Sequence, residues 1–395
     1  MKKKRILIAI ESLVAAGAEK SLITFLSVLD YNRFEVDLQL FRYGGEFERY
    51  IPKEVNLLPP FDYTWFLEKD ILSQVLSFDL KKLWARISYS IAIRRGTTYH
   101  MDKARLYWKH VFPCITTNPK EYDIAIGYAQ GLPTFYVVDK VHARQKWAWV
   151  NVSYRPSGVN YPFQERFYGT LNHIVTVSDS AYDVFSKVYP QFKDKMLVLW
   201  DMLDARFIEK MSEIEKEDKM DLSVPCLLTI ARLNKPQKGY DISLEACKIL
   251  RNRGIAFKWY AIGRGSYKEE MEKYITENNL EDTFILLGTT PNPYPYIKDA
   301  TLYVQTSRHE GFGLSIAEAR ILNTPVVTTE FDAVYNQMVH GKNGLVVPQE
   351  PVAVADAVEK LLSDKKLYQS IVAYQQQEKK GNSEEIEKFY ALIEE

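Results

Sequence analysis

Residues 306–328 read TSRHEGFGLSIAEARILNTPVVT, a segment that passes from a buried strand through a tight turn into a helix. Leu302–Thr306 is a short apolar run that ends in polar residues, as a buried strand does, and two glycines then permit a sharp turn. Helical spacing follows from Leu314 to Leu322. A helix that begins near Gly313 directs unpaired backbone N–H groups and the positive end of its dipole at the turn. A diphosphate is the natural occupant of such a turn.

Two glutamates bracket this turn. Glu310 precedes the helix, and Glu318 lies in its second turn. With about 1.5 Å of rise per helical residue, their carboxylates would meet one elongated ligand at separate points instead of sharing a proton or a metal. One carboxylate then suits a sugar ring and the other a ribose. The alternative interpretation of the spacing is two glutamates on a solvated helix.

Apolar runs and helical patterns alternate along the chain, which is typical of parallel sheets covered by helices on both faces. The alternation occurs twice and predicts an α/β protein with two doubly wound domains. The strands expected in the first half are Arg5–Ile10, Val36–Phe41, Asp123–Gly127, Lys146–Asn151, His173–Val177 and Leu197–Leu199. Those expected in the second half are Cys226–Ala231, Phe257–Ile262, Thr283–Leu287, Leu302–Gln305, Pro325–Thr328 and Leu345–Val347.

The chain has 395 residues, more than one hydrophobic core usually holds. We predict a first domain over residues 1–203, with a basic, aromatic helical insertion at about 61–120, and a second domain over residues 204–382. The highly charged segment 209–221 is expected to belong to the connection between them. Residues 383–395 are amphipathic and predict a terminal helix.

Composition excludes several classes of protein. Lys plus Arg and Asp plus Glu both number 51, which argues against nucleic-acid binding as the main role. The cysteines, Cys114, Cys226 and Cys247, lack pairing or metal-ligand spacing, so a reducing cytoplasm is expected. Glu11 interrupts the first apolar run, which favours a strand and a turn over a secretory signal. No stretch of about 18 residues lacks charge, so no membrane span is expected.

Two cations follow a predicted strand of the second half, within the segment RLNKPQKGYD at 232–241. Ligands of doubly wound sheets bind beyond the carboxyl ends of the strands. The planar guanidinium of Arg232 and the compact ammonium of Lys238 would there oppose the charge that builds on a departing diphosphate. The alternative is a pair of solvated loop cations.

The E-x7-E spacing with an internal Gly-Phe-Gly resembles the signature of retaining glycosyltransferases of family 4, the glycosyl transferases of group 1. The resemblance implies a GT-B fold, in which two Rossmann-like doubly wound domains face one another across a cleft. It implies as well that the terminal helix at 383–395 crosses back to the first domain. It also implies that Glu310 holds donor-sugar hydroxyls and stabilises charge at the anomeric carbon, while Glu318 binds ribose. Arg232 and Lys238 match the family's cationic pair, so the implied catalytic residues are Glu310, Arg232 and Lys238.

Further turns match the family's donor site. The segment SLVAAGAEK at 12–20 resembles the family's Gly-Gly-Ala-Glu loop, with Ala16 and Gly17 in place of two glycines. Thr290, in LLGTT, matches the position at which the family reads the base. Ordinary turns between strands and helices are the alternative for both segments. The donor-binding residues implied by the resemblance are Gly17, Thr290, Gly311, Phe312, Gly313, Leu314 and Glu318.

The first domain is expected to supply the acceptor side. Many members of the family carry Trp-Ile-His or Trp-Val-His at the end of a strand, whereas this chain has Trp149–Val150–Asn151. An amide orients a hydroxyl but does not accept a proton as an imidazole does. Asn151 is therefore a candidate acceptor-side residue that positions a hydroxyl, and the leaving phosphate would take the proton.

Segment 61–120 contains ten Lys or Arg against five Asp or Glu, with many aromatic residues between them. Helical periodicity is expected across Ile71–Arg95. In the favoured interpretation the aromatics pack a helical insertion and the cations form its solvated side. In the other interpretation the insertion rests on an anionic inner membrane leaflet. Nucleic-acid binding is disfavoured because no recognised module frames the segment.

Taken together, the motifs and the resemblance imply a hexosyltransferase-type enzyme that is retaining and metal-independent and needs no cofactor. The donor would be a nucleotide-sugar, most simply a UDP- or GDP-sugar. The acceptor would be a saccharide or lipid-linked saccharide in bacterial surface polysaccharide or glycoconjugate synthesis. We expect a cytoplasmic location, peripheral on the inner membrane face if the insertion meets lipid. The alternatives are a GT-B sugar-nucleotide epimerase and a catalytically silent nucleotide-sugar-binding or scaffold homologue.

Overall fold

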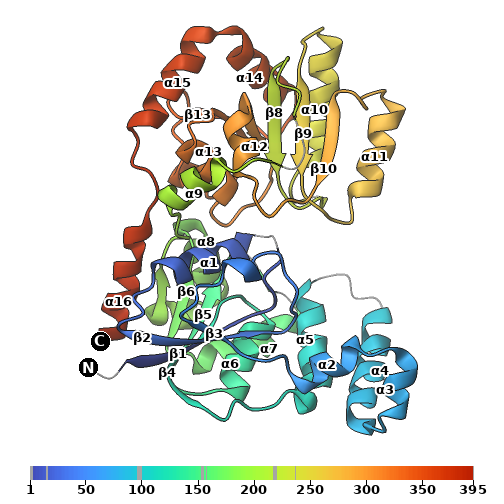
Figure 1. Ribbon diagram of the computed structural model, residues 1–395, viewed down its shortest axis with the longest axis vertical. Coiled ribbons are helices and arrows are strands. Elements are labelled where there is room, and N and C mark those ends of the chain that lie inside the picture. Colours follow the sequence, from blue (N-terminus) through green and yellow to red (C-terminus); the bar gives the residue numbers. More distant parts are fainter. Residues whose placement is uncertain are drawn as a thin grey trace. The chain divides into compact units, whose positions relative to one another are not determined.

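The computed structural model describes residues 3–14, 17–95, 100–152, 155–156, 158–216, 220–235 and 237–394. The chain divides into two compact units, one comprising Met1–Trp200 with Ile386–Glu395 and the other comprising Asp201–Glu385. Each unit contains a parallel sheet with helices on both faces, as Figure 1 shows. The predicted α/β class with two doubly wound units is confirmed.

The first unit is built on a seven-stranded sheet in the order β3-β2-β1-β4-β5-β6-β7. Its strands are β1 (Lys4–Ile10), β2 (Phe34–Leu40), β3 (Val55–Leu57), β4 (Glu121–Gly127), β5 (His142–Val150), β6 (His173–Thr176) and β7 (Met196–Val198). In the register, Ile6 of β1 lies between Val36 of β2 and Ile124 of β4. The strand order reverses between β1 and β4, so the loop after β1 lies at the topological switch point.

One face of this sheet is covered by α1 (Gly17–Val28) and α16 (Ile386–Glu394). Phe25 of α1 packs against Phe389 of α16, with ring centroids 4.9 Å apart. Phe389 also contacts Trp147 of β5, at a centroid distance of 5.5 Å. The last helix of the chain therefore completes the core of the first unit.

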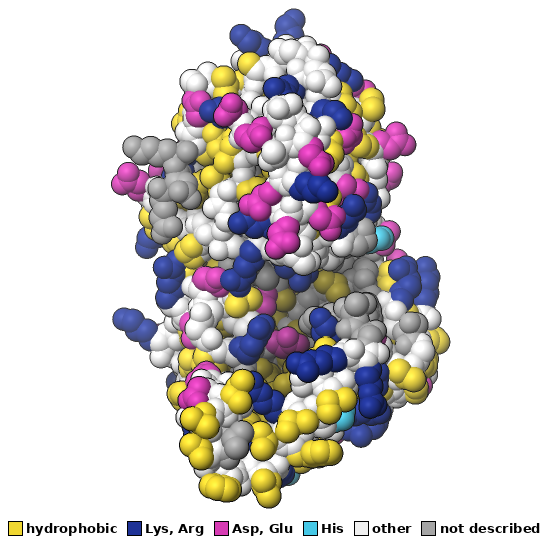
Figure 2. Space-filling model, turned by 90° about the vertical axis from the view of Figure 1, so that its right-hand side faces the viewer, with side chains coloured by type: hydrophobic (Ala, Val, Ile, Leu, Met, Phe, Trp, Pro, Cys, Tyr) yellow, Lys and Arg dark blue, Asp and Glu magenta, His cyan; other side chains and the backbone are white. Residues whose placement is uncertain are grey.

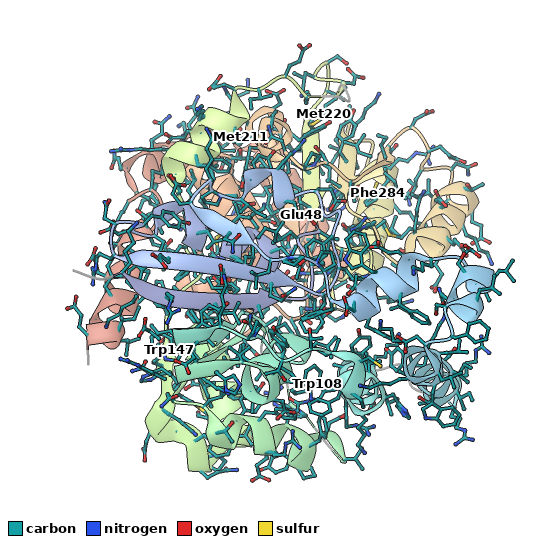
Figure 3. The ribbon with its side chains drawn as sticks, turned by 60° about the horizontal axis from the view of Figure 1, so that its bottom comes forward. Glu48, Trp108, Trp147, Met211, Met220 and Phe284 are labelled. Atoms are coloured by element: carbon teal, nitrogen blue, oxygen red, sulfur yellow. The ribbon has the colours of Figure 1, made fainter. Side chains whose placement is uncertain are left out.

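The opposite face is covered by α5 (His100–Val111), α6 (Leu132–Lys140) and α7 (Asn160–Thr170). Leu7 and Ala125 of the sheet share an apolar cluster with Trp108 of α5 and Phe135 of α6. Trp108 and Trp147, both labelled in Figure 3, thus serve cores on opposite faces of one sheet. The remaining helices of the unit are α2 (Asp62–Glu68), α3 (Ile71–Leu76), α4 (Leu80–Arg94), α8 (Asp179–Val188) and the 3₁₀ turns Glu48–Tyr50, Phe112–Cys114 and Pro190–Lys195.

The helical insertion differs from the prediction at one point. Periodicity predicts helix across Ile71–Arg95, whereas the structure breaks it into α3 and α4. Phe78 adopts a left-handed backbone with φ of 52°, and Asp79 caps α4 by accepting a hydrogen bond from the Lys82 N–H at 3.0 Å. A local capping interaction has ended a pattern that side-chain spacing alone would continue.

The second unit is built on a six-stranded sheet in the order β10-β9-β8-β11-β12-β13. Its strands are β8 (Cys226–Ile230), β9 (Lys258–Ile262), β10 (Phe284–Gly288), β11 (Leu302–Gln305), β12 (Val326–Thr329) and β13 (Gly344–Val347). Buried residues of α10 (Tyr240–Asn252), α11 (Lys268–Glu277), α14 (Pro351–Ser363) and α15 (Lys365–Gln377) form one apolar cluster with the strands. On the other side α9 (Ala205–Ser212), α12 (Tyr294–Asp299) and α13 (Leu314–Ile321) contact one another, and the 3₁₀ turns are Val334–Asn336 and Ser383–Glu385.

The predicted strands are all present, with ends that differ by a few residues. The described residues also form β3, which was not predicted. The charged segment 209–221 is also corrected in part. Its first four residues complete α9, whose Ile208 and Ser212 are buried, and residues 217–219 lie outside the described ranges.

Glycines allow neighbouring loops of the second unit to cross with their backbones in contact. Gly239, after β8, has a left-handed backbone with φ of 62°, and an added Cβ would overlap the carbonyl oxygen of Thr306, after β11. An added Cβ on Gly263, after β9, would likewise overlap the carbonyl oxygen of Ala231. These contacts fix the loops after β8, β9 and β11 against one another.

Replacing Phe389 by alanine should destabilise the first unit by about 3–5 kcal/mol, because a fully buried ring between α1 and the sheet would leave a cavity. Chemical denaturation of the full chain measures this loss. Glu387→Ala, at an exposed position of the same helix, is the matched control and should stay within about 0.5 kcal/mol of the parent. Equal effects of the two substitutions would contradict the packing described for α16.

Gly239→Ala should lower the free energy of unfolding for two reasons, the left-handed backbone at this position and the overlap of the added Cβ with Thr306. Gly254→Ala is the control, because Gly254 has φ of 76° but no atom within 4 Å of an added Cβ. We expect about 1–2 kcal/mol for Gly254→Ala and about 1–3 kcal/mol more for Gly239→Ala. Denaturation midpoints of the two variants compare the losses, and a Gly239 variant as stable as the Gly254 variant would contradict the crossing.

Candidate functional site

The loop between β11 and α13 is tied to the loop between β8 and α10. The Arg308 N–H donates to the carbonyl oxygen of Gln237 at 2.8 Å, and the Thr306 hydroxyl donates to the carbonyl oxygen of Lys238 at 3.2 Å. The Arg308 guanidinium forms a bidentate pair with Asp241 of α10, at 2.9 and 2.7 Å. Both loops leave the carboxyl ends of adjacent parallel strands, where doubly wound sheets bind their ligands.

Glu310 lies at the centre of a compact hydrogen-bond cluster. Its Oε1 accepts from Lys238 Nζ at 2.7 Å, from Ser307 Oγ at 2.6 Å and from Gln305 Nε2 at 2.7 Å. Its Oε2 accepts from the same ammonium at 2.6 Å. The side chains of Lys238 and Glu310 are only 13% and 10% exposed, so the ion pair is largely withdrawn from solvent. The structure thus joins two of the residues that the sequence predicts as catalytic.

The charge state of Glu310 follows from these contacts. Burial by itself would raise the pKa of the carboxyl group. The charge of Lys238 and the hydrogen bonds from Lys238, Ser307 and Gln305 outweigh burial, and the pKa lies below its ordinary value. At neutral pH the carboxylate is therefore an anion that accepts hydrogen bonds and has no proton to give.

Gln305 and Ser307 belong to the site although neither was predicted from the sequence. The Tyr303 hydroxyl donates to Gln305 Oε1 at 2.5 Å, and burial holds the pKa of this tyrosine well above its ordinary value. Gln305 Nε2 in turn donates to Ser307 Oγ at 2.7 Å as well as to Glu310. The hydrogen bond from Tyr303 orients the Gln305 amide, and the amide in turn orients the Glu310 carboxylate. The sequence feature that could have identified Gln305 and Ser307 is the run of polar residues at the end of an apolar strand.

The turn into α13 contains the predicted residues Gly311, Phe312, Gly313 and Leu314. Gly313 is the N-cap, with a left-handed φ of 85° and no side-chain capping bond. The N–H groups of Ile316 and Ala317 are the first to donate to the carbonyl oxygen of Gly313. The N–H groups that precede them in the first turn are therefore directed out of the end of the helix. Gln337 Nε2 donates to the carbonyl oxygens of Phe312 and Gly313 at 2.5 and 3.2 Å and so holds the turn.

Glu318 and Glu310 have different neighbours. Glu318 is fully buried in α13, and its Oε1 accepts from the Tyr294 hydroxyl of α12 at 3.3 Å. Glu310 instead faces the loop after β8. The two carboxylates are therefore held by separate elements, as an elongated ligand with two contact points would need.

The other predicted residues of the second unit lie in loops at the ends of strands. Arg232 follows β8 and its side chain is exposed, while the next residue, Leu233, is anchored by a backbone bond to Arg264 at 2.9 Å. Thr290 follows β10, and its hydroxyl accepts from the Asn292 N–H at 3.2 Å. The Thr290 hydroxyl is thus part of a turn.

Gly17 and Asn151 belong to the first unit. Gly17 begins α1 after the switch-point strand, whereas Ala16 lies outside the described residues. Asn151 follows β5, and its Nδ2 donates to the carbonyl oxygen of Tyr128 at 2.8 Å. Its Oδ1 is buried and has no hydrogen-bond partner within the described part of the chain. An amide oriented in this way can still accept a hydrogen bond from a hydroxyl.

The described residues hold neither a cluster of metal ligands nor a membrane-spanning helix. In these ranges no three His, Cys, Asp or Glu side chains come together as metal ligands. Likewise, none of the helices drawn from these residues is both long and apolar enough to cross a bilayer.

The second half of the chain is similar in sequence to a known protein family. Residues 210–378 match the family model described as Glycosyl transferases group 1. A poly(ribitol-phosphate) α-N-acetylglucosaminyltransferase from Staphylococcus aureus is 35% identical over 130 residues, which are 32% of this chain and 26% of the relative. The α-D-kanosaminyltransferase of Streptomyces kanamyceticus is 30% identical over 167 residues, 42% of this chain and 43% of the relative. The matched segments thus span less than half of these curated relatives.

Solved structures resemble the chain over nearly its whole length. TarM of S. aureus, in complex with UDP, Fondaparinux and α-GlcNAc-glycerol, has a TM-score of 0.70 at 16% identity, covering 99% of this chain and 100% of TarM. HepE of Anabaena, in complex with UDP and glucose, has a TM-score of 0.66 at 18% identity, covering 94% of both chains. The predicted GT-B class is therefore confirmed as a fold, and residues 210–378 resemble the glycosyl transferases of group 1 in sequence.

Proposed function

We propose that this chain is a retaining glycosyltransferase that moves a hexosyl group from a UDP-sugar to a saccharide acceptor. The observation that carries the proposal is the largely buried Lys238–Glu310 pair beside the uncapped first turn of α13. Such a site offers a cation and backbone N–H groups for a diphosphate, and an anion for sugar hydroxyls. The likeness to group 1 glycosyl transferases and the UDP complexes of TarM and HepE support this choice of donor.

The chemistry would divide among these groups. The bond between the anomeric carbon and the diphosphate oxygen breaks, and negative charge grows on the leaving UDP. The ammonium of Lys238, the guanidinium of Arg232 and the N–H groups at the start of α13 would stabilise that charge. Glu310, ionised at neutral pH, would accept hydrogen bonds from sugar hydroxyls and oppose the positive charge at the anomeric carbon.

Two anchors would position the donor. Glu318 would bind the ribose from within α13, and the loop after β10 with Thr290 would meet the base. Gly17, at the start of α1, would permit close approach to the phosphates. On the acceptor side Asn151 would position the attacking hydroxyl, whose proton passes to the leaving phosphate on the same face of the sugar, so that the anomeric configuration is retained.

A divalent cation has no step in this scheme, because cationic side chains and backbone N–H groups supply the charge that a metal would supply. The acceptor class would be a saccharide or lipid-linked saccharide of a bacterial surface polysaccharide or glycoconjugate. The relative from S. aureus, described as acting on poly(ribitol-phosphate), favours an acceptor of this kind. The three buried free cysteines suit a cytoplasmic location.

The proposal is tested with a thermal-shift panel of UDP-, GDP-, ADP- and dTDP-sugars, followed by product analysis. A ligand at 100 times its dissociation constant adds about 2.7 kcal/mol to stability, and the UDP-sugar should give the largest shift. Incubation with acceptor should release UDP and form a glycoside of retained configuration, with or without a chelator. An altered sugar nucleotide formed without acceptor would identify an epimerase. Binding without any turnover would identify a silent homologue, and no shift with any donor would overturn the donor site itself.

Lys238→Ala should lower turnover by about 10²–10³-fold, the usual effect of removing one preorganised electrostatic donor. Because the substitution also leaves Glu310 without its ion partner, its thermal unfolding must be measured beside the rate. Lys235→Ala, in the same loop but at an exposed position, is the control and should keep the parent rate within about twofold. A folded Lys238 variant with parental turnover would refute the role of the ammonium.

A further inference from the structure

Large apolar side chains are exposed on the helical insertion of the first unit. Phe78 is 81% exposed, Leu80 73% and Trp84 69%. We call the following set the apolar surface: Trp65, Ile71, Leu72, Leu76, Phe78, Leu80, Trp84, Ile87 and Ile91. Figure 2, in which the side of the molecule with α2, α3 and α4 faces the viewer, shows hydrophobic side chains gathered there with Lys and Arg among them.

On α4 the apolar surface follows one side of the helix. Leu80, Trp84, Ile87 and Ile91 are spaced by four, three and four residues, which places them in one row. Other positions of α4 already serve the core, because Ala85 is buried and Leu83 and Tyr89 pack against the same cluster as Trp108. The helix therefore has a second apolar side that faces solvent.

This arrangement confirms the interpretation favoured from the sequence for most of the aromatic residues and corrects it for two of them. Packing into the domain accounts for Phe66 and Trp108, which are 3% exposed each. It does not account for Trp65 and Trp84, which are 53% and 69% exposed. Exposed apolar groups that gather on one surface of a soluble protein mark a site of interaction.

Phe78 is the most exposed member of the apolar surface and has an unusual backbone. It lies in the turn between α3 and α4 with φ of 52°, a region that bulky residues rarely adopt. The fixed Asp79 cap of α4 follows directly. The fold thus holds an aromatic ring outward at a local cost in conformational energy, as is typical of functional positions.

The charge along α4 and the turn before it is mainly positive, whereas the acids near the apolar surface, Asp62, Glu68 and Asp70, lie along α2 and just before α3. Residues 78–95 contain five Lys or Arg and one Asp in a chain whose net charge is zero. That acid, Asp79, is already paired with Lys82 at 3.0 Å. Lys81, Arg94 and Arg95 are exposed, and Lys69 is exposed before α3. A partner that covers the apolar row of α4 would therefore be apolar and would carry negative charge.

We propose that the apolar surface docks on an anionic lipid membrane, with Phe78 and Trp84 in the headgroup region and the exposed cations against lipid phosphates. Aromatic rings with flanking Lys and Arg are the residues that bind such interfaces. A second copy of the chain is a poorer occupant, because a symmetric interface between two α4 helices would set the same cations against one another. Docking does not depend on the transferase activity. If the proposed function holds as well, docking selects a lipid-linked acceptor.

The test is flotation of the full-length protein with vesicles, without donor or acceptor. Vesicles of phosphatidylcholine with about 30% phosphatidylglycerol should bind the protein at least tenfold more than phosphatidylcholine alone, and 0.5 M salt should reduce the binding. The double variant Phe78→Ser with Trp84→Ser, and separately Lys81→Glu with Arg94→Glu, should each lower binding at least tenfold. The matched control is Leu222→Ser with Val352→Ser, two exposed apolar residues of the second unit, and it should bind like the parent.

Thermal unfolding and the nucleotide-induced shift of each variant show whether it is folded, independently of lipid. Folded variants that lose vesicle binding would support docking even if no sugar were ever transferred. No binding to anionic vesicles, equal binding to neutral vesicles, or equal losses in the control variant would overturn the proposal. Self-association of the parent, abolished by Phe78→Ser with Trp84→Ser and seen without vesicle binding, would overturn it in favour of an interface between copies.

Discussion

The ion pair between Lys238 and Glu310 is the contact on which the candidate site of the second unit depends, at the carboxyl ends of its parallel strands. It joins two loops that are far apart in the chain and adjacent in space because β8 and β11 are neighbours in a parallel sheet. A buried pair with good hydrogen bonds holds its position, whereas removal of one partner leaves a buried charge uncompensated. Glu310 and Lys238 therefore lie together only as long as β8 and β11 remain neighbours in the sheet.

The cluster around the pair shows how a core can set the chemistry of a surface. Tyr303 is buried inside the sheet, yet its hydroxyl determines which way the Gln305 amide points, and that amide donates to Glu310. Beside Lys238, the carboxylate is thus held ionised in part by a hydrogen-bond chain that begins in the core. Such preorganisation removes the reorganisation that a solvated carboxylate would undergo when charge develops nearby.

The predictable part of the molecule is the part that periodicity and glycine geometry determine. Apolar runs located the strands, and the Gly-Phe-Gly turn located the start of α13 to within a residue. Gln305 and Ser307 were not found, because their role depends on a hydrogen-bond chain that crosses between strand and loop. The break at Phe78 was also missed, since spacing alone does not reveal where a cap will end a helix. Asn151 could be named from the sequence, but its buried Oδ1 could not.

The insertion of the first unit shows the limit of an amphipathic pattern most clearly. A row of apolar residues on α4 predicts that one side of the helix is covered, but it does not say by what. Ala85 and Tyr89 already pack α4 against the core of the first unit. The exposed row through Trp84 is therefore additional apolar surface, which folding alone does not require. Lys82 and Arg86 are engaged by Asp79 and Gln74, but Lys81, Arg94 and Arg95 are exposed beside this row in a chain whose net charge is zero. Selection for an external, anionic partner explains both the exposure and the charge, whereas selection for stability explains neither.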